Sequence, residues 1–134
     1  MILADTNVWS VLSKPRPEPK PFSWIAANEP QLWLSPIVIA EVRFGYERPE
    51  AAAKRGTLEK WLADLEREYR DRTLPFDSAA GHQLGRLLLA KPQQAKLLDT
   101  LLAAQALSRD CPIATRNTRD FDWTGASLID PWRD

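Results

Sequence analysis

The stretch Met1-Ile-Leu-Ala-Asp5-Thr6-Asn7 opens the sequence, and in it a short apolar run leads directly to a carboxylate. A continuous apolar run of this length is typical of a parallel strand that is buried on both faces. In a parallel sheet, ligands bind beyond the carboxyl ends of the strands. Asp5 is therefore expected at a ligand-binding edge of the sheet.

Short apolar runs alternate with helical patterns along the rest of the chain, which indicates an α/β fold with a mostly parallel sheet. Strands are predicted at Met1–Ala4, Leu32–Leu34, Pro112–Ala114 and Ser127–Ile129. Helices are predicted at Asn7–Ser13, at Phe22–Asn28, from Pro36 onward with Ser35 as N-cap, at Glu50–Arg70, from a cap at Asp77 or Ser78 to about Leu89, and at Lys96–Arg109. The alternating prolines of residues 15–21 predict a stiff extended link, either a surface loop or an arm that contacts RNA or a partner.

The length of 134 residues fits one domain, which is expected to span 1–134. The 18 basic and 18 acidic residues balance, so the basic excess of a protein that coats DNA is lacking. The single Cys111 excludes an internal disulfide and a cysteine-based zinc cluster. The most apolar run, Leu97–Leu107, is too short and too polar to cross a bilayer, and no signal-peptide pattern is found. A soluble, cytoplasmic protein with no membrane contact is expected.

Two further acids lie on apolar helix faces. Glu41 shares helical spacing with Ile37 and Phe44, which places it on the apolar stripe of its helix. Asp99 lies within Lys96–Arg109, a helix that is apolar nearly all round and is expected in the core. A buried carboxylate is costly unless it is paired or bound to a cation, so both positions imply a shared partner.

The side chains that could meet at this partner are Asp5, Glu41 and Asp99, with Asn117 and Asp120 as further candidates. Asn117 follows a predicted strand, as Asp5 does, so both are expected at the same edge of the sheet. Carboxylates without histidine or cysteine partners favour Mg²⁺ or Mn²⁺ over zinc. Two such ions about 4 Å apart can activate a water and stabilise the leaving oxygen of a phosphodiester. Hydrolysis of a phosphodiester is the reaction that this set of residues favours.

Other chemistry finds little support in the sequence. His82, the only histidine, and Cys111 have no evident partner for nucleophilic catalysis, and both are interpreted as ordinary surface or packing residues. No glycine motif that cradles a nucleotide occurs. Most of the six tryptophans are expected in core or dimer packing, whereas Trp9, close in sequence to Asp5, is the candidate for stacking on a substrate base.

Four segments of the sequence follow one another in a characteristic order, and together they span nearly the whole chain. They are Ile2-Leu-Ala-Asp5-Thr6-Asn7-Val8, Ser35-Pro-Ile-Val-Ile-Ala-Glu41-Val, Leu98-Asp99-Thr-Leu-Leu-Ala-Ala104 and Ala114-Thr-Arg-Asn117-Thr-Arg-Asp120-Phe121. In this order they resemble PIN-domain ribonucleases, specifically the VapC-type toxins of bacterial toxin–antitoxin pairs. The closing segment Asp130-Pro-Trp-Arg-Asp134 also resembles the tail of the related FitB-like proteins.

The resemblance implies a PIN-like three-layer α/β fold, in which a central, mostly parallel five-stranded sheet is flanked by helices. It also implies a homodimer and the Mg²⁺- or Mn²⁺-dependent endonucleolytic cleavage of RNA. By the same resemblance, Asp5, Glu41 and Asp99 supply the first three acids of the metal site. Thr6 and Thr115 match positions that orient those carboxylates.

The fourth acidic position of the family is frequently Asp, and it aligns here with Asn117. An amide offers a ligand oxygen but brings no charge, so a second metal would bind weakly or only with substrate present. Asp120, three residues on, could supply the missing charge if the turn folds back, and both residues stay open as direct ligands. Asn7 and Arg116 are candidates for substrate contact together with Trp9.

The resemblance further implies a cognate antitoxin, similar to VapB, whose C-terminal segment wraps the toxin and inserts an arginine into the acidic site. A basic side chain there would replace the cation. Operator DNA is then expected to be bound only through the antitoxin. Two alternatives stay open. One is a non-catalytic PIN-type module that binds RNA or a protein, kept open by Asn117, and the other is a DNA nuclease or phosphatase that uses the same acids.

Overall fold

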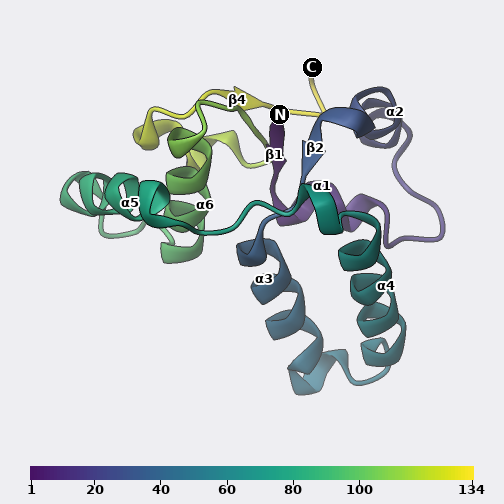
Figure 1. Ribbon diagram of the computed structural model, residues 1–134. Helices are drawn as coiled ribbons and strands as arrows, with labels where there is room; N and C mark the ends of the chain where they lie inside the picture. The colour runs from purple at the N-terminus through teal and green to yellow at the C-terminus, as the bar shows by residue number, and fades with distance from the viewer.

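Strand β1 (Ile2–Ala4) is an inner strand of the sheet and is buried along its whole length, as its apolar sequence predicts. In the computed structural model, which describes residues 1–134, β1 pairs in parallel with β2 (Leu32–Trp33) and with β3 (Ile113–Ala114). Strand β4 (Leu128–Ile129) pairs in parallel with β3 and completes the order β2-β1-β3-β4. The predicted α/β class and parallel sheet are confirmed (Figure 1).

Six helices surround the sheet, and none of them is both long and apolar enough to cross a membrane. They are α1 (Thr6–Val11), α2 (Pro19–Asn28), α3 (Pro36–Glu47), α4 (Arg55–Glu68), α5 (Ser78–Ala90) and α6 (Leu97–Ser108). Short 3-10 turns occupy Glu29–Gln31, Pro49–Ala51, Arg70–Arg72, Thr118–Asp120 and Asp122–Thr124. Ser35 and Asp77 cap α3 and α5 as predicted, because their side chains accept hydrogen bonds from backbone N–H groups of the first turn.

The sheet has four strands instead of the five that the resemblance implies. At its β2 edge, Leu34 forms only a single parallel bridge with Thr73. The N–H of Leu34 donates to the carbonyl of Arg72 at 2.9 Å, and the N–H of Leu74 donates to the carbonyl of Leu34 at 2.8 Å. Pro75 follows at once and has no N–H for a longer ladder, so the fifth strand is reduced to this bridge.

Two helix starts differ from the prediction by more than one residue. Helix α2 begins at Pro19 instead of Phe22, because proline needs no N–H partner in the first helical turn, and the extended link is correspondingly shorter. Helix α4 begins at Arg55 instead of Glu50. The Arg55 side chain donates to the carbonyl of Tyr46 at 2.7 Å, which fixes the tight turn between α3 and α4 and leaves the preceding residues outside the helix.

The sheet divides the core into two halves. Ile2 and Ala4 belong to an apolar cluster with residues of α1, α3 and α4, whereas Leu3 points to the other face and packs with residues of α5 and α6. Each fully buried aliphatic side chain in these clusters contributes about 1.5–3 kcal/mol to stability. Figure 1 shows α3 and α4 as one helix pair and α5 and α6 as another, and the three-layer arrangement is confirmed.

A buried polar side chain joins two of the helices. Gln105 of α6 is fully buried, and its carbonyl oxygen accepts a hydrogen bond from the hydroxyl of Ser35, the residue that caps α3. Its amide nitrogen donates to the carbonyl of Leu74 at 2.8 Å. Because α3 carries Glu41 and α6 carries Asp99, this bonded amide sets how the two acid-bearing helices lie against each other.

Candidate active site

The carboxyl ends of β1 and β3 meet at one edge of the sheet, and Asp5 lies there as the N-cap of α1. Its Oδ1 accepts from the backbone N–H of Thr6 at 2.8 Å, and its Oδ2 accepts from the Thr115 hydroxyl at 2.8 Å and the Asn7 amide at 3.2 Å. The residue is only 5% exposed. Burial raises the pKa of Asp5 above its ordinary value, although the three hydrogen bonds oppose that shift. The carboxylate is thus held in one orientation where its charge is costly.

Glu41 reaches the same edge from α3. The hydroxyl of Thr6 donates to its Oε1 at 2.9 Å, so the residue after Asp5 orients a second carboxylate. Burial raises the pKa of Glu41, and the charge of Asp5 raises it further. Thr6 is thus a hydrogen-bond partner of Glu41, whereas the cation that Glu41 was expected to share with Asp99 stays a prediction. The apolar stripe on which Glu41 was predicted to lie is wrong. Phe44 on that face is 68% exposed, and α3 turns Val38 into the core instead.

Asp99 lies in the first turn of α6 and is half-buried. Burial is the main cause that raises the pKa of Asp99 from 3.8 to about 6. The negative charges of Asp5 and Glu41 raise this pKa further, and the charge of Asp120 follows them, whereas Lys96 lowers it. The acids are therefore close enough to act on one another electrostatically.

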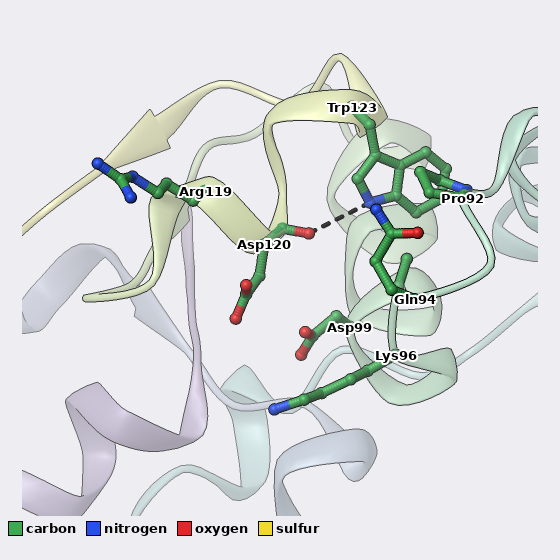
Figure 2. Close-up of a pocket in the computed structure, with 8 residues that line it drawn as sticks. Pro92, Gln94, Lys96, Asp99, Arg119, Asp120 and Trp123 are labelled. Carbon is green, nitrogen blue, oxygen red and sulfur yellow. Dashed lines mark hydrogen bonds between the residues drawn. The ribbon is translucent and has the colours of Figure 1, made fainter.

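Asn117 and Asp120 lie on the loop after β3, and both are exposed. The backbone N–H of Asn117 donates to the Thr115 hydroxyl at 3.0 Å, so the loop turns at the residue that holds Asp5. The charge of Asp120 acts on both Asp5 and Asp99. Figure 2 shows the carboxylates of Asp99 and Asp120 facing the same space. The turn folds back as the sequence interpretation required, and it brings Asp120 to the other acids.

All five predicted ligand residues line one pocket of about 420 Å³, called the acid pocket below: Asp5, Glu41, Asp99, Asn117 and Asp120. They do not form a closed cage, since no three acidic, histidine or cysteine side chains are arranged to hold an ion by themselves. The atoms that these side chains offer to a cation are nevertheless oxygen atoms. Mg²⁺ is commonly held by one or two carboxylates, keeps several waters and shares phosphate oxygens. An open acidic pocket fits such a cation better than it fits a closed structural metal site.

The prediction that Trp9 stacks on a substrate base is wrong. Its ring is fully buried, and its Nε1 donates to the carbonyl of Ala4 at 3.1 Å. It packs edge-to-face against Tyr69, with ring centroids 4.8 Å apart. The tryptophans that line the pockets at this edge are Trp123 and Trp132, which no periodicity in the sequence singles out.

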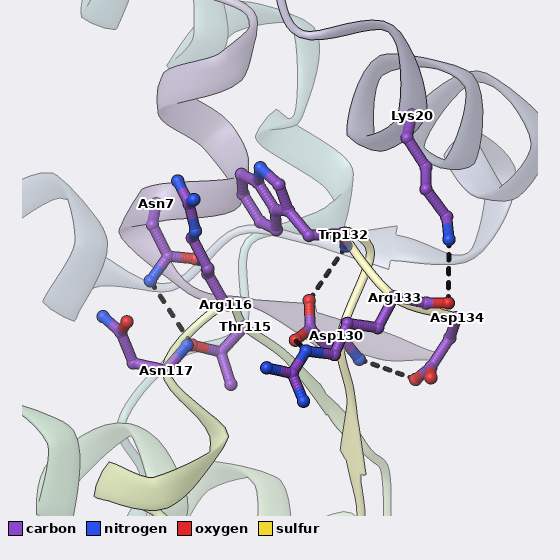
Figure 3. Close-up of polar contacts among 9 residues, drawn as sticks. All are labelled: Asn7, Lys20, Thr115, Arg116, Asn117, Asp130, Trp132, Arg133 and Asp134. Atoms are coloured by element: carbon purple, nitrogen blue, oxygen red, sulfur yellow. Dashed lines mark hydrogen bonds and ion pairs between the residues drawn. The ribbon is translucent and has the colours of Figure 1, made fainter.

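Trp132 lines the acid pocket, and Glu18 and Arg116 hold its ring there. Its Nε1 donates to Glu18 at 3.1 Å, and the Arg116 guanidinium lies over the indole ring, 5.1 Å from its centroid. Arg116 and Glu18 also form an ion pair at 3.8 Å. The Nζ of Lys20 donates to the carbonyl of Arg133 at 2.9 Å (Figure 3). The C-terminal segment and the start of α2 therefore fasten each other beside the pocket.

The two other predicted substrate contacts lie next to each other. The side-chain oxygen of Asn7 accepts from the backbone N–H of Arg116 at 3.0 Å, and its amide nitrogen donates to Thr115 at 3.3 Å. Both residues line the acid pocket, although the amide of Asn7 is already engaged in these hydrogen bonds. Lys14 and Lys96 also line it and were missed in the sequence. Of these two lysines, only Lys96 could have been predicted from the sequence, because it lies one helical turn before Asp99.

Comparison with known proteins identifies close similarity along the whole chain. The profile of the PIN domain family matches residues 2–125. The VapC ribonuclease Y4jK of Sinorhizobium fredii is 34% identical over 137 aligned positions, which cover 98% of each chain. Toxin FitB of Neisseria gonorrhoeae is 29% identical, with 100% of both chains covered. The crystal structure of FitAcB from the same organism has a TM-score of 0.84 and 27% identity, with 100% of both chains covered.

Proposed function

Because the chain belongs to the PIN domain family, we propose that it is a metal-dependent endoribonuclease toxin of the VapC type. It cleaves phosphodiester bonds of cellular RNA in the cytoplasm by the attack of an activated water. The observation that carries this proposal is the gathering of Asp5, Glu41, Asp99 and Asp120 in one open pocket at the carboxyl ends of the strands. The ribonuclease name of the similar VapC protein supports it, since the similarity extends over 98% of both chains.

The acids of the pocket fit Mg²⁺ or Mn²⁺ in their chemistry. Asp5, Glu41, Asp99 and Asp120 are the residues that would hold the cation, and Asn117 offers a neutral oxygen. A bound divalent cation of this kind lowers the pKa of a coordinated water and offsets charge that develops on the phosphate. The missing charge at Asn117 makes one firmly held ion, with a second one recruited together with substrate, the expected arrangement.

The chain itself prepares the pocket for this chemistry. The Thr115 hydroxyl holds one oxygen of Asp5, so the carboxylate does not need to reorient when a substrate phosphate arrives. Lys96 lowers the pKa of both Glu41 and Asp99, and thereby opposes their tendency to bind protons. Lys96 also lines the acid pocket, where its ammonium can meet a phosphate oxygen.

The proposal includes the partners of such a toxin. A cognate antitoxin similar to VapB holds it inactive, and operator DNA is bound only through that antitoxin. The similar fold of the FitAcB structure supports an antitoxin partner. Leucines are exposed where α5 ends and α6 begins, and this apolar surface supports a homodimer. They are Leu88, Leu89, Leu97 and Leu98.

A non-catalytic PIN-type module that binds RNA or a protein is the second candidate. Asn117 favours it, because this position lacks a charge. Calorimetric titration with Mn²⁺ separates the two. Heat of binding, alone or with a substrate analogue, supports the nuclease, whereas no heat in either titration supports the binding module.

The direct test is cleavage of a structured RNA by the purified protein without antitoxin. Cleavage is expected with Mg²⁺ or Mn²⁺ and is expected to stop with EDTA. Asp5→Ala and Asp99→Ala should abolish it, while Asp71→Ala, an exposed residue outside the acid pocket, should cleave as the wild type does. Cleavage that persists in both pocket variants and in EDTA would refute the proposal. Parallel assays on single-stranded DNA and a phosphomonoester identify a DNA nuclease or a phosphatase.

A further inference from the structure

A second cavity, of about 250 Å³, opens directly beside the acid pocket. Lys96, Asp99 and Asp120 line both of them, so the two spaces adjoin at these residues. The remaining walls come from the loop before α6 and from the turns after β3. They are formed by Pro92, Gln94, Ala95, Arg119 and Trp123. A phosphodiester placed at the acids therefore has this cavity within reach of its adjoining nucleoside.

We propose that this cavity is a nucleobase subsite, in which one unpaired base of the RNA stacks on Trp123 and is read by Gln94. The inference rests on the RNA cleavage proposed above and adds a determinant of where the RNA is cut. Sequence-specific recognition of RNA mostly uses unpaired bases that stack on aromatic rings and pair along their edges. The cavity combines an aromatic wall with an amide, next to the acids.

Trp123 is a rigid wall of the cavity. Its Nε1 donates to the carbonyl of Asp120 at 3.2 Å, which fixes the plane of the ring. The ring packs against the apolar cluster that includes the α6 residues, yet it is only half-buried. Since a backbone oxygen occupies Nε1, the indole offers its apolar surface to a ligand. Stacking on such a surface tolerates every base, so Trp123 supplies affinity and no preference of its own.

Gln94 supplies the directional contact. It is exposed in the loop between α5 and α6, where the N–H of Ala95 donates to the carbonyl of Pro92 at 3.1 Å and fixes the turn. The side chain of Gln94 lines the cavity together with Trp123. An amide presents a donor and an acceptor together, which allows it to pair with two adjacent groups on the edge of a base.

The cations around the cavity suit the phosphates on either side of a bound base. The ammonium of Lys96 lies at the boundary with the acid pocket, beside Asp99 (Figure 2). The guanidinium of Arg119 points away from the carboxylates, and Arg119 also lines a neighbouring pocket with Arg116 and Arg133. Basic side chains therefore flank the cavity on the acid side and on the outer side, as the backbone of a nucleotide requires.

A purely structural role for Trp123 gives different expectations. In that case its replacement would change stability alone, and Gln94, on a separate exposed loop, would have no effect on cleavage. Only a shared ligand makes both residues act on the same nucleotide position. This distinction decides the design of the test.

The test uses short single-stranded RNAs that carry each of the four bases at the positions flanking the cleaved bond. Wild-type protein is expected to prefer some bases at one position, measured as ratios of kcat/KM. Gln94→Ala should reduce the largest ratio about tenfold, the effect of roughly one lost base contact. Gln93→Ala is the matched control, because Gln93 is exposed on the same loop and lines neither cavity.

A second arm removes the base instead of the side chain. An abasic nucleotide at the preferred position should lower the kcat/KM of the wild type about tenfold, mainly through KM, as loss of a stacked base does. It should lower the kcat/KM of Trp123→Leu much less, because the stacking contact is already absent. Circular dichroism of Trp123→Leu checks that it is folded, and Gln94→Ala, on an exposed loop, carries the test if it is not.

The outcomes separate this inference from the function on which it rests. If the wild type cleaves no RNA, the proposed function fails and the subsite fails with it. If the wild type cleaves RNA but its base preference survives Gln94→Ala, or if it has no base preference at all, only the subsite is refuted. A preference that falls in Gln94→Ala but not in Gln93→Ala supports it.

Discussion

Replacing Asp99 by Asn is expected to stabilise the metal-free protein at neutral pH, although it removes a proposed metal ligand. The pKa of Asp99 is about 6 in the folded chain, against an ordinary value of 3.8, because of burial and the neighbouring acids. The folded state thus binds this proton more tightly than the unfolded state does. Asp99 therefore costs the folded state stability as the pH rises from about 4 to about 6, and this loss is complete at neutral pH.

The size of the effect follows from the shift in pKa. Two pKa units correspond to about 3 kcal/mol. Asp99 is only half-buried, and solvent screening reduces the contribution to about 1 kcal/mol. Asn matches the protonated acid in shape and charge, so the variant avoids this cost at every pH. A domain of this size has a total stability of about 5–15 kcal/mol, and a difference of about 1 kcal/mol is measurable by urea unfolding.

The assay is urea unfolding in EDTA at pH 4 and at pH 7. Wild type and Asp99→Asn should have nearly equal free energies of unfolding at pH 4, and the variant should exceed the wild type by about 1 kcal/mol at pH 7. Asp71→Asn, on an exposed turn, should follow the wild type at both. Added Mn²⁺ should stabilise the wild type more than Asp99→Asn. An Asp99→Asn variant that is less stable at pH 7, or a difference that does not change with pH, would refute the reasoning.

Two further predictions concern side chains that position the acids of the pocket and are not themselves proposed metal ligands. Gln105→Leu should lower the free energy of unfolding by about 2–3 kcal/mol, because two buried hydrogen bonds are lost, while Gln93→Leu on the surface should not. Urea unfolding measures both, and equal stability of Gln105→Leu and wild type would contradict the expectation. Thr115→Val should weaken Mn²⁺ binding about tenfold in calorimetry, since Asp5 loses the hydroxyl that orients it, and Thr115→Ser should restore it. Unchanged Mn²⁺ affinity in Thr115→Val would show that the hydroxyl does not position the carboxylate.

The features that the sequence predicted correctly depend on local physics. A helix cap such as Ser35 or Asp77 needs only a side-chain oxygen a few residues before a backbone N–H. Asp5 was placed at the sheet edge because a buried apolar strand ends immediately before it. The alternation of strands and helices then gave the parallel sheet. Features of this kind can be predicted because all the residues that determine them lie within one short segment of the sequence.

The errors occur where distant segments decide the surroundings of a residue. Trp9 is close to Asp5 in sequence, but Tyr69, far along the chain, packs against its ring and the core covers it. Phe44 has the spacing of a core residue, yet its side chain is exposed at the far end of α3. Periodicity describes which residues share a face, and it contains no information about what that face meets.

The second cavity shows the same limit on a smaller scale. Gln94 lies in a polar loop and Trp123 in a short 3-10 turn, and neither belongs to a recognisable motif. They become neighbours only because α6 packs against the sheet and the loop after β3 turns back over it. The sequence predicts the outline of the acidic set, whereas the neighbours of that set depend on how distant segments pack in three dimensions.

The hydrogen-bonded pair of Gln105 and Ser35 has a consequence for how such chains diverge. The amide oxygen accepts from the Ser35 hydroxyl and the nitrogen donates to the Leu74 carbonyl, so reversing the amide would set its oxygen against that carbonyl, acceptor against acceptor. A substitution at either residue alone leaves a buried polar group without a hydrogen-bond partner. In related proteins we therefore expect the two positions either to change together or to stay the same. Substitutions at these two buried positions would then change how Glu41 and Asp99 lie relative to each other, while every residue that lines the acid pocket stays the same.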